Sequence, residues 1–174
     1  VVLVGGGLEA WYRPEDFSPF SVFRLVEPLG PAAIERPGGG PSPHVWLEPE
    51  ALDLAAAGLA DHLAASFPSK TAEFRARRAE LSKTLASLEA ELRPALAALP
   101  ELFASRLGYA YAARAFGWDM EVLGVDPAKP PDAAELERWR TRREAHPAKL
   151  ILFPEPPARP VAAALREVGL EPVV

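Results

Sequence analysis

The sequence KLILFPEPPARPVAAALREVGLEPVV, residues 149–174, is the clearest indicator of the fold. Its first five residues, a lysine and four apolar residues, have the length of a strand, and a helix is predicted over residues 161–168. Gly169 stands where that helix ends, because glycine adopts the backbone conformation that closes a last helical turn. A second strand is predicted at Pro172. Together these elements form a βαβ unit, which is typical of parallel sheets.

The same alternation extends upstream of this unit. A helix is predicted around residues 108–116, a strand over 120–125 and a further helix from Ala133. Asp132 and Glu135 match the capping box that begins a helix, in which each side chain accepts the other residue's backbone N–H. The predicted fold class is therefore α/β, with a right-handed parallel lobe in the last third of the chain.

Helices dominate the prediction for the middle of the chain. Pro49 suits a first helical position, and apolar residues three or four apart continue to Phe67. A second helix is predicted from Ser69 to Arg93, roughly 37 Å long at about 1.5 Å per residue, before Pro94 bends or weakens it. Two interpretations remain, a rigid spine that joins two lobes or half of a helical hairpin or coiled coil. Strands on both sides favour the spine.

The first part of the chain is predicted to be a strand followed by irregular segments. The strand, residues 1–4, ends in three glycines at 5–7, and a short helix is predicted over 20–29. Prolines and glycines between residues 31 and 43 then predict a loop that carries His44. We predict part of an N-terminal α/β lobe over residues 1–67, a long linking helix over 68–99 and part of a C-terminal α/β lobe over 100–174.

Composition excludes several classes of protein. The 174 residues, 49% hydrophobic and 25% charged, can bury a core and contain no segment long enough to span a membrane. A net charge of −5 disfavours nucleic acid as a partner, and the lack of cysteine excludes disulfides and thiolate metal sites. Any metal would be bound by His, Asp or Glu. Both ends are apolar and strand-like, so we expect a chain truncated at both ends.

The sequence carries no catalytic signature. It contains no G-x-S-x-G elbow, no H-E-x-x-H, no D-x-D-x-D-G loop and no Walker motif, and the glycines at 5–7 lack the G-x-G-x-x-G spacing. We therefore predict that the protein is not an enzyme. An uncharacterised hydrolase is the least favoured interpretation, because no nucleophile and base are paired.

Two residues are candidates for binding a ligand. His44 follows Pro43, which stiffens the approach to it. Glu155 follows a predicted strand, and the carboxyl ends of strands are where α/β sheets bind ligands. The alternatives are a core or surface histidine and a solvated loop glutamate. For His62 and His146 the ordinary roles are preferred, on a solvated face and at a helix C-terminus respectively.

Several segments, in order along the chain, carry a resemblance to a known family. Residues 5–11, GGGLEAW, are similar to N-G-L-x-x-E-x-W, and residues 43–49, PHVWLEP, are close to D-P-H-V-W-L-D-P. The long helix follows, then LGY at 107–109, similar to the end of H-D-A-F-G-Y, and FPEP at 153–156, similar to F-x-E-P-Q. With these motifs the chain resembles, over nearly its whole length, the metal-specific (zinc/manganese-type) periplasmic solute-binding proteins of ABC importers.

This resemblance implies two α/β lobes joined by a rigid long helix, with a metal held in the cleft by about four His, Asp or Glu ligands. His44 matches one family ligand, and Glu155 is a candidate second donor or a hydrogen-bond partner of a ligand. The family's next histidine falls at Ala104, which cannot coordinate, and Arg106 nearby repels a cation. The family's first histidine and last carboxylate ligand are expected upstream and downstream of this chain.

The resemblance also implies a function. It implies an extracytoplasmic protein that captures zinc or manganese (Zn or Mn) and delivers the ion to an ABC transporter permease at the membrane. The expected location is the periplasm or the outer face of the cytoplasmic membrane, and the expected state is a monomer. The alternative is a diverged member that has lost metal binding and serves another small solute or partner. Ala104 and Arg106 motivate this alternative, because an inward-facing arginine suits an anion.

Overall fold

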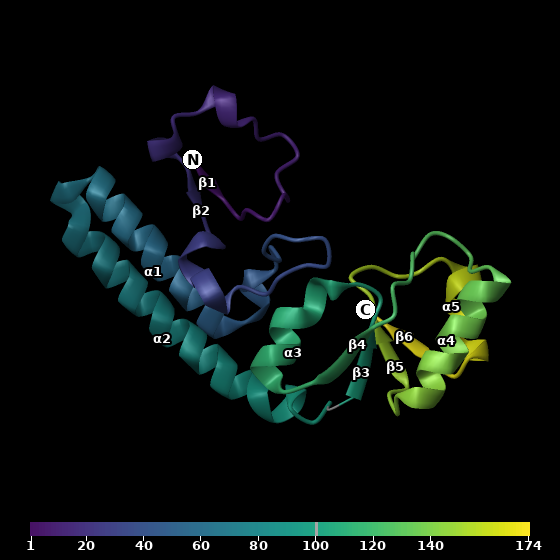
Figure 1. Cartoon of the computed structure of the whole chain (residues 1–174). Coiled ribbons are helices and arrows are strands. Elements are labelled where there is room, and N and C mark those ends of the chain that lie inside the picture. Colours follow the sequence, from purple (N-terminus) through teal and green to yellow (C-terminus); the bar gives the residue numbers. More distant parts are fainter. Residues whose placement is uncertain (100) are drawn as a thin grey trace. The chain divides into compact units, whose positions relative to one another are not determined.

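The computed structural model describes residues 1–99 and 101–174 and divides the chain into two compact units, Val1–Pro94 and Ala95–Val174 (Figure 1). The boundary falls inside helix α2 (Thr71–Leu96), and each unit is described by itself. The predicted boundary at residue 100 lies outside the described residues. Both units contain parallel strands together with helices, so the predicted α/β class is confirmed.

The first unit begins with two very short strands. β1 (Val2–Leu3) pairs in parallel with β2 (Phe23–Arg24), and two 3-10 turns, η1 (Pro14–Asp16) and η2 (Pro19–Ser21), lie between them. The predicted helix over residues 20–29 is therefore wrong. The backbone N–H of Phe23 donates to the Val1 carbonyl at 2.9 Å, so this stretch is held extended by the first strand. Prolines then limit the following η3 (Glu27–Ala32) to 3-10 turns.

Two long helices follow later in the first unit, as predicted. α1 (Pro49–Ser66) begins directly after η4 (Val45–Leu47), and η5 (Pro68–Lys70) connects it to α2. The two helices lie side by side in Figure 1, and Asp53 of α1 accepts hydrogen bonds from Arg78 and Ser82 of α2. Leu85 is the buried side chain that α2 contributes to the described structure.

The second unit is a four-stranded parallel sheet with the order β4-β3-β5-β6. Its strands are β3 (Glu101–Ala104), β4 (Asp119–Val122), β5 (Leu150–Leu152) and β6 (Glu171–Val173), and its helices are α3 (Ala110–Phe116), α4 (Ala133–Ala145) and α5 (Arg159–Glu167). The 3-10 turn η6 (Leu107–Tyr109) precedes α3. Asp132 and Glu135 form the predicted capping box at the start of α4, and Gly169 has a φ of 82° after α5. The central strand β3 was not predicted.

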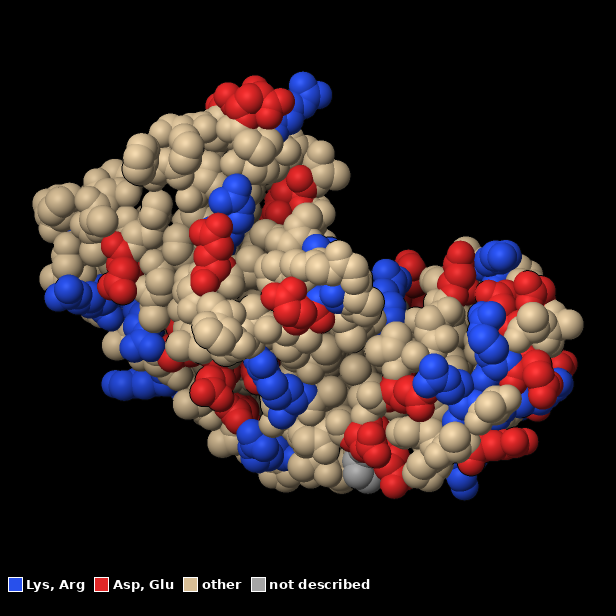
Figure 2. All heavy atoms as spheres, viewed as in Figure 1, with Lys and Arg blue, Asp and Glu red and all other residues tan. Residues whose placement is uncertain are grey.

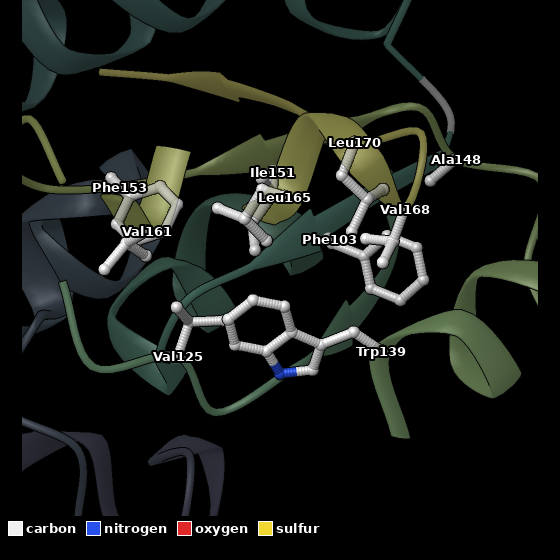
Figure 3. Close-up of a cluster of buried hydrophobic side chains, with 10 residues drawn as sticks. All are labelled: Phe103, Val125, Trp139, Ala148, Ile151, Phe153, Val161, Leu165, Val168 and Leu170. Carbon is white, nitrogen blue, oxygen red and sulfur yellow. The ribbon is translucent and has the colours of Figure 1, made fainter. Parts of the chain in front are cut away.

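The core of this unit lies between the sheet and helices α4 and α5 (Figure 3). Trp139 of α4 and Leu165 of α5 pack against Phe103 and Ile151, which stand opposite each other on the two central strands. Because side chains alternate along a strand, Leu102 and Ala104 point to the other face, on which α3 lies in Figure 1. Helices thus cover both faces of the sheet, and a loop at its carboxyl edge carries Glu155.

Among the described residues, none of the helices has both the length and the apolar character needed to cross a membrane. On the face that Figure 2 shows, acidic and basic side chains alternate over the second unit and do not gather into an area of one sign.

Candidate metal centre

His44 follows a loop that is closed at its base. Glu35 and Pro41 form an antiparallel bridge, and the Arg36 backbone N–H donates to the Gly40 carbonyl at 3.0 Å. Beyond the bridge the Ser42 N–H donates to the carbonyl of Ile34 at 2.7 Å. The loop therefore returns to its starting point before it reaches His44.

The imidazole of His44 is half-buried and has defined neighbours. Its Nδ1 lies 3.2 Å from the hydroxyl oxygen of Ser42, which is 1% exposed, and its ring lies edge-on to Trp46 with 5.3 Å between centroids. In the tautomer in which Nδ1–H donates to Ser42, the lone pair is on Nε2, the atom that can then coordinate a metal. The fully buried Val45 anchors the next turn and so limits the movement of His44.

Glu155 and Arg106 meet at the carboxyl edge of the second unit's sheet. Arg106 follows β3 and Glu155 follows β5, the strand beside it, and the guanidinium Nη2 lies 3.5 Å from the carboxylate Oε1. Both side chains are more than half exposed, so this ion pair contributes at most about 1 kcal/mol. A cation that binds to Glu155 would compete with Arg106 for the same oxygen.

Ala104 ends β3 as a fully buried methyl side chain, which offers no donor atom. The next residue, Ser105, is 1% exposed, and its hydroxyl has no hydrogen-bond partner within the described part of the chain. Nothing in the sequence distinguishes this serine, since its burial depends on the neighbouring strands. Nearby, burial raises the pKa of the Tyr109 hydroxyl, and the positive charge of Arg106 offsets part of that rise.

The other two histidines have structural contacts. The half-buried ring of His62 packs against Phe23 of β2 with 5.3 Å between centroids. The prediction that His62 lies on a solvated face is therefore wrong. His146 directly follows α4, as predicted, and is 9% exposed. Its Nδ1 accepts the N–H of Ala148 at 3.2 Å, and its ring lies 4.8 Å from that of Phe103.

The two candidate donors belong to different units, His44 to the first and Glu155 to the second. Within residues 1–99 and 101–174, no three His, Asp or Glu side chains form a group that could hold a metal ion. Among the described residues, neither His44 nor Glu155 is thus part of a group of three potential ligands.

Sequence analysis missed Glu9, whose carboxylate is the main polar contact of the glycine turn after β1. Its Oε1 accepts the backbone N–H of Val4 at 2.6 Å, and its two oxygens lie 3.3 and 3.4 Å from the N–H of Gly5. The resemblance motif contained this glutamate, but its partners are backbone groups that the sequence does not identify.

Comparison with known proteins gives one family match. The family described as "Zinc-uptake complex component A periplasmic" (ZnuA) matches residues 1–173. A curated relative, the high-affinity zinc uptake system protein ZnuA of Haemophilus ducreyi, is 32% identical over 122 residues, which are 67% of this chain and 38% of the relative. The chain therefore spans well under half the length of that relative.

Solved structures resemble the chain in fold. A periplasmic metal binding protein from Candidatus Liberibacter asiaticus has a TM-score of 0.76 at 16% identity, over 98% of this chain and 66% of that one. Zn(II)-bound AdcA from Streptococcus pneumoniae has a TM-score of 0.72 at 22% identity, over 88% of this chain and 34% of that one. At these identities the likeness concerns the fold alone.

Proposed function

We propose, since the chain belongs to the zinc-uptake complex component A (ZnuA) family, that it is the solute-binding part of a metal ABC importer. In this role it captures a divalent metal ion outside the cytoplasm and delivers it to a permease. The observation that carries the proposal is the family match over residues 1–173, which includes the loop with His44. The protein is then a binding and transport component and not an enzyme.

Zinc is the metal we propose. The curated relative is named for zinc uptake, and the matching AdcA structure is described as Zn(II)-bound. Imidazole and carboxylate donors suit Zn²⁺, and they also bind Mn²⁺, which makes manganese the ion to compare. The general affinity order places zinc above manganese at such donors, so we expect zinc to bind more tightly than manganese.

His44 and Glu155 are the donors that we assign to this chain. His44 is supported by the Ser42 contact, since ligand imidazoles commonly donate their second ring N–H to an oxygen. Glu155 is supported by its position at the carboxyl edge of the parallel sheet. Structural Zn²⁺ sites take four donors and catalytic sites three, so the proposal requires donors in addition to these two.

For this function we propose a chain that is divided into two lobes and a linking segment. Residues 1–67 and 100–174 belong to two lobes, and the segment 68–99, which contains α2, links them. A monomer in the periplasm, or anchored at the outer face of the membrane, is the state that fits capture and delivery.

Native mass spectrometry of the intact, metal-stripped protein, titrated with Zn²⁺ and then with Mn²⁺, tests the proposal. We expect one Zn²⁺ per chain in the wild type and weaker binding of Mn²⁺. His44→Ala should lower zinc affinity by more than about 100-fold, since even residues that only orient a ligand contribute about 10–100-fold. Glu155→Gln should lower it less, because the wild-type carboxylate is shared with Arg106.

His62→Ala is the matched control, because it removes an imidazole that packs against Phe23. It should leave zinc affinity within about threefold of the wild type, below the effect of an orienting residue. If the wild type binds no zinc, or if His44→Ala binds it as tightly as the wild type, the assignment fails. A wild type that binds no zinc would favour the diverged-member alternative.

A further inference from the structure

The glycine turn that follows β1 lies directly against the segment that carries His44. A Cβ atom placed on Gly6 would lie 2.8 Å from the carbonyl oxygen of Pro41 and 3.1 Å from the Cβ of Pro43. Real Cβ atoms essentially never approach backbone oxygen at 2.8 Å, so only a hydrogen atom fits between the two segments. Gly6 also has a φ of 64°, a backbone conformation that glycine adopts at little cost.

Glu9 holds this turn in place through its backbone contacts. Its carboxylate accepts the N–H groups of Val4 and Gly5, with the shortest distance at 2.6 Å. Hydrogen bonds from backbone N–H groups to a carboxylate are stronger than those between neutral groups. The end of β1 and the turn are therefore joined by one side chain, and the pairing of β1 with β2 fixes the other side of this strand.

The segment on the other side of the contact transmits any displacement to His44. Pro43 is buried and is bonded directly to His44, and its ring restricts the backbone. Ser42, also buried, meets the imidazole through its hydroxyl. A shift of a few tenths of an ångström at Pro43 therefore moves both the backbone of His44 and the partner of its Nδ1.

We propose that Gly6 and Glu9 are positioning residues for His44: together they hold the imidazole in its metal-binding orientation before any metal arrives. The role in metal capture rests on the proposed function, whereas the effect on the imidazole in the metal-free protein does not. A preformed orientation raises affinity because the ion does not have to order the loop.

Four variants test this inference, Gly6→Ala, Gly7→Ala, Glu9→Gln and Glu9→Ala. Gly7 is the matched control, because its φ of 81° imposes the same backbone strain on alanine while an added Cβ meets nothing within 4 Å. Glu9→Gln keeps an oxygen acceptor for the turn, and Glu9→Ala removes it. Circular dichroism at each stage establishes that the variants are folded.

The first measurement is made without metal, by recording the ¹⁵N NMR shifts of the His44 imidazole at one fixed pH. Gly6→Ala and Glu9→Ala should change the shift of Nδ1, which reports its contact with Ser42. Gly7→Ala should leave that shift as in the wild type, and Glu9→Gln should restore it largely. The inference is overturned if the Nδ1 chemical shift of His44 is the same in Gly6→Ala as in Gly7→Ala. If Gly6→Ala does not fold, Glu9→Ala decides, and an Nδ1 shift equal to that of the wild type overturns the inference.

The second measurement is a calorimetric titration of the same variants with Zn²⁺. Gly6→Ala should weaken binding about 10–100-fold, and Gly7→Ala by less than about threefold. If the wild type binds no zinc, the proposed function fails while the NMR result still decides whether Gly6 and Glu9 position His44. If zinc binds but all four variants match the wild type in affinity, the role of Gly6 and Glu9 in metal capture is excluded and the proposed function stands.

Discussion

In the second unit, Ala95–Val174, ten buried apolar side chains form one cluster between a sheet and two helices (Figure 3). In the first unit, Val1–Pro94, the strands have two residues each, and the two long helices are joined by the polar contacts of Asp53. The two candidate donors are therefore positioned in different ways. The sheet places Glu155, whereas close backbone contacts of glycine and proline place His44.

The largest difference between the units should follow from Trp139→Ala. Trp139 is 2% exposed in the apolar cluster, and removal of a buried aromatic side chain costs about 3–5 kcal/mol. Hydrogen exchange resolved by peptide should show this loss in the second unit and little change in residues 1–94. Leu88→Ala, at a leucine of α2 that is 44% exposed, is the control and should stay within about 0.5 kcal/mol. If Trp139→Ala and Leu88→Ala lost similar amounts of stability, the apolar cluster would not distinguish the second unit from the first.

A smaller effect, confined to the first unit, is expected from Asp53→Ala. The substitution removes the acceptor of Arg78 and of Ser82 and so leaves two donors at the contact between α1 and α2. Because the side chains of Arg78 and Asp53 are 38% and 28% exposed, we expect the free energy of unfolding to fall by about 1–2 kcal/mol. This is less than the loss expected when a fully buried charged pair is broken. Urea unfolding and exchange of the amides of α1 measure it. Asp61→Ala, at an exposed position of the same helix, should have less effect, and equal effects would contradict the role of Asp53.

The smallest effect concerns a polar pair at the rim of the second unit. Arg166 of α5 donates hydrogen bonds from Nε and Nη2 to the carboxylate oxygens of Glu171 of β6, and these lower the pKa of the Glu171 carboxyl. Since the folded pKa lies below the unfolded one, the pair stabilises the protein above the unfolded pKa of about 4.3. That contribution is lost as the pH falls through the lower folded pKa.

Thermal unfolding at pH 6 and pH 3 measures this dependence. The decrease in Tm between the two pH values should be slightly smaller in Glu171→Gln than in the wild type, because the variant lacks the titrating group. An identical decrease would show that the pair contributes nothing. A decrease reduced by more than half would show that this pair contributes far more than an exposed ion pair normally does.

Elements with a local physical cause could be predicted from the sequence. Pro49 at the start of α1, the capping box of Asp132 and Glu135, and Gly169 after α5 each act within one helical turn. Strands that exist because of distant partners could not. Residues 101–104 form a central strand because β4 and β5 pair with both of its sides, and residues 23–24 are extended because β1 lies beside them.

The same distinction holds for the candidate site. His44 and Glu155 could be chosen from their residue types and motifs, and Ala104 could be identified by resemblance. The contacts around them could not, because the fit of Gly6 against Pro43 and the pairing of Arg106 with Glu155 join segments that are far apart in the sequence. Such contacts depend on the folded backbone and leave no pattern within a short window.

The strand order β4-β3-β5-β6 also has a consequence for how the second unit folds. During synthesis β3 emerges before all its partners, and its second edge is unpaired until residues 150–152 arrive. Pairings between segments distant in sequence form slowly, and an unpaired apolar edge invites association with other chains. The helices of the first unit, by contrast, meet through neighbours in sequence and can form while the rest is still being made. A nascent chain should therefore be most prone to aggregate in the interval between the completion of β4 and the arrival of β5.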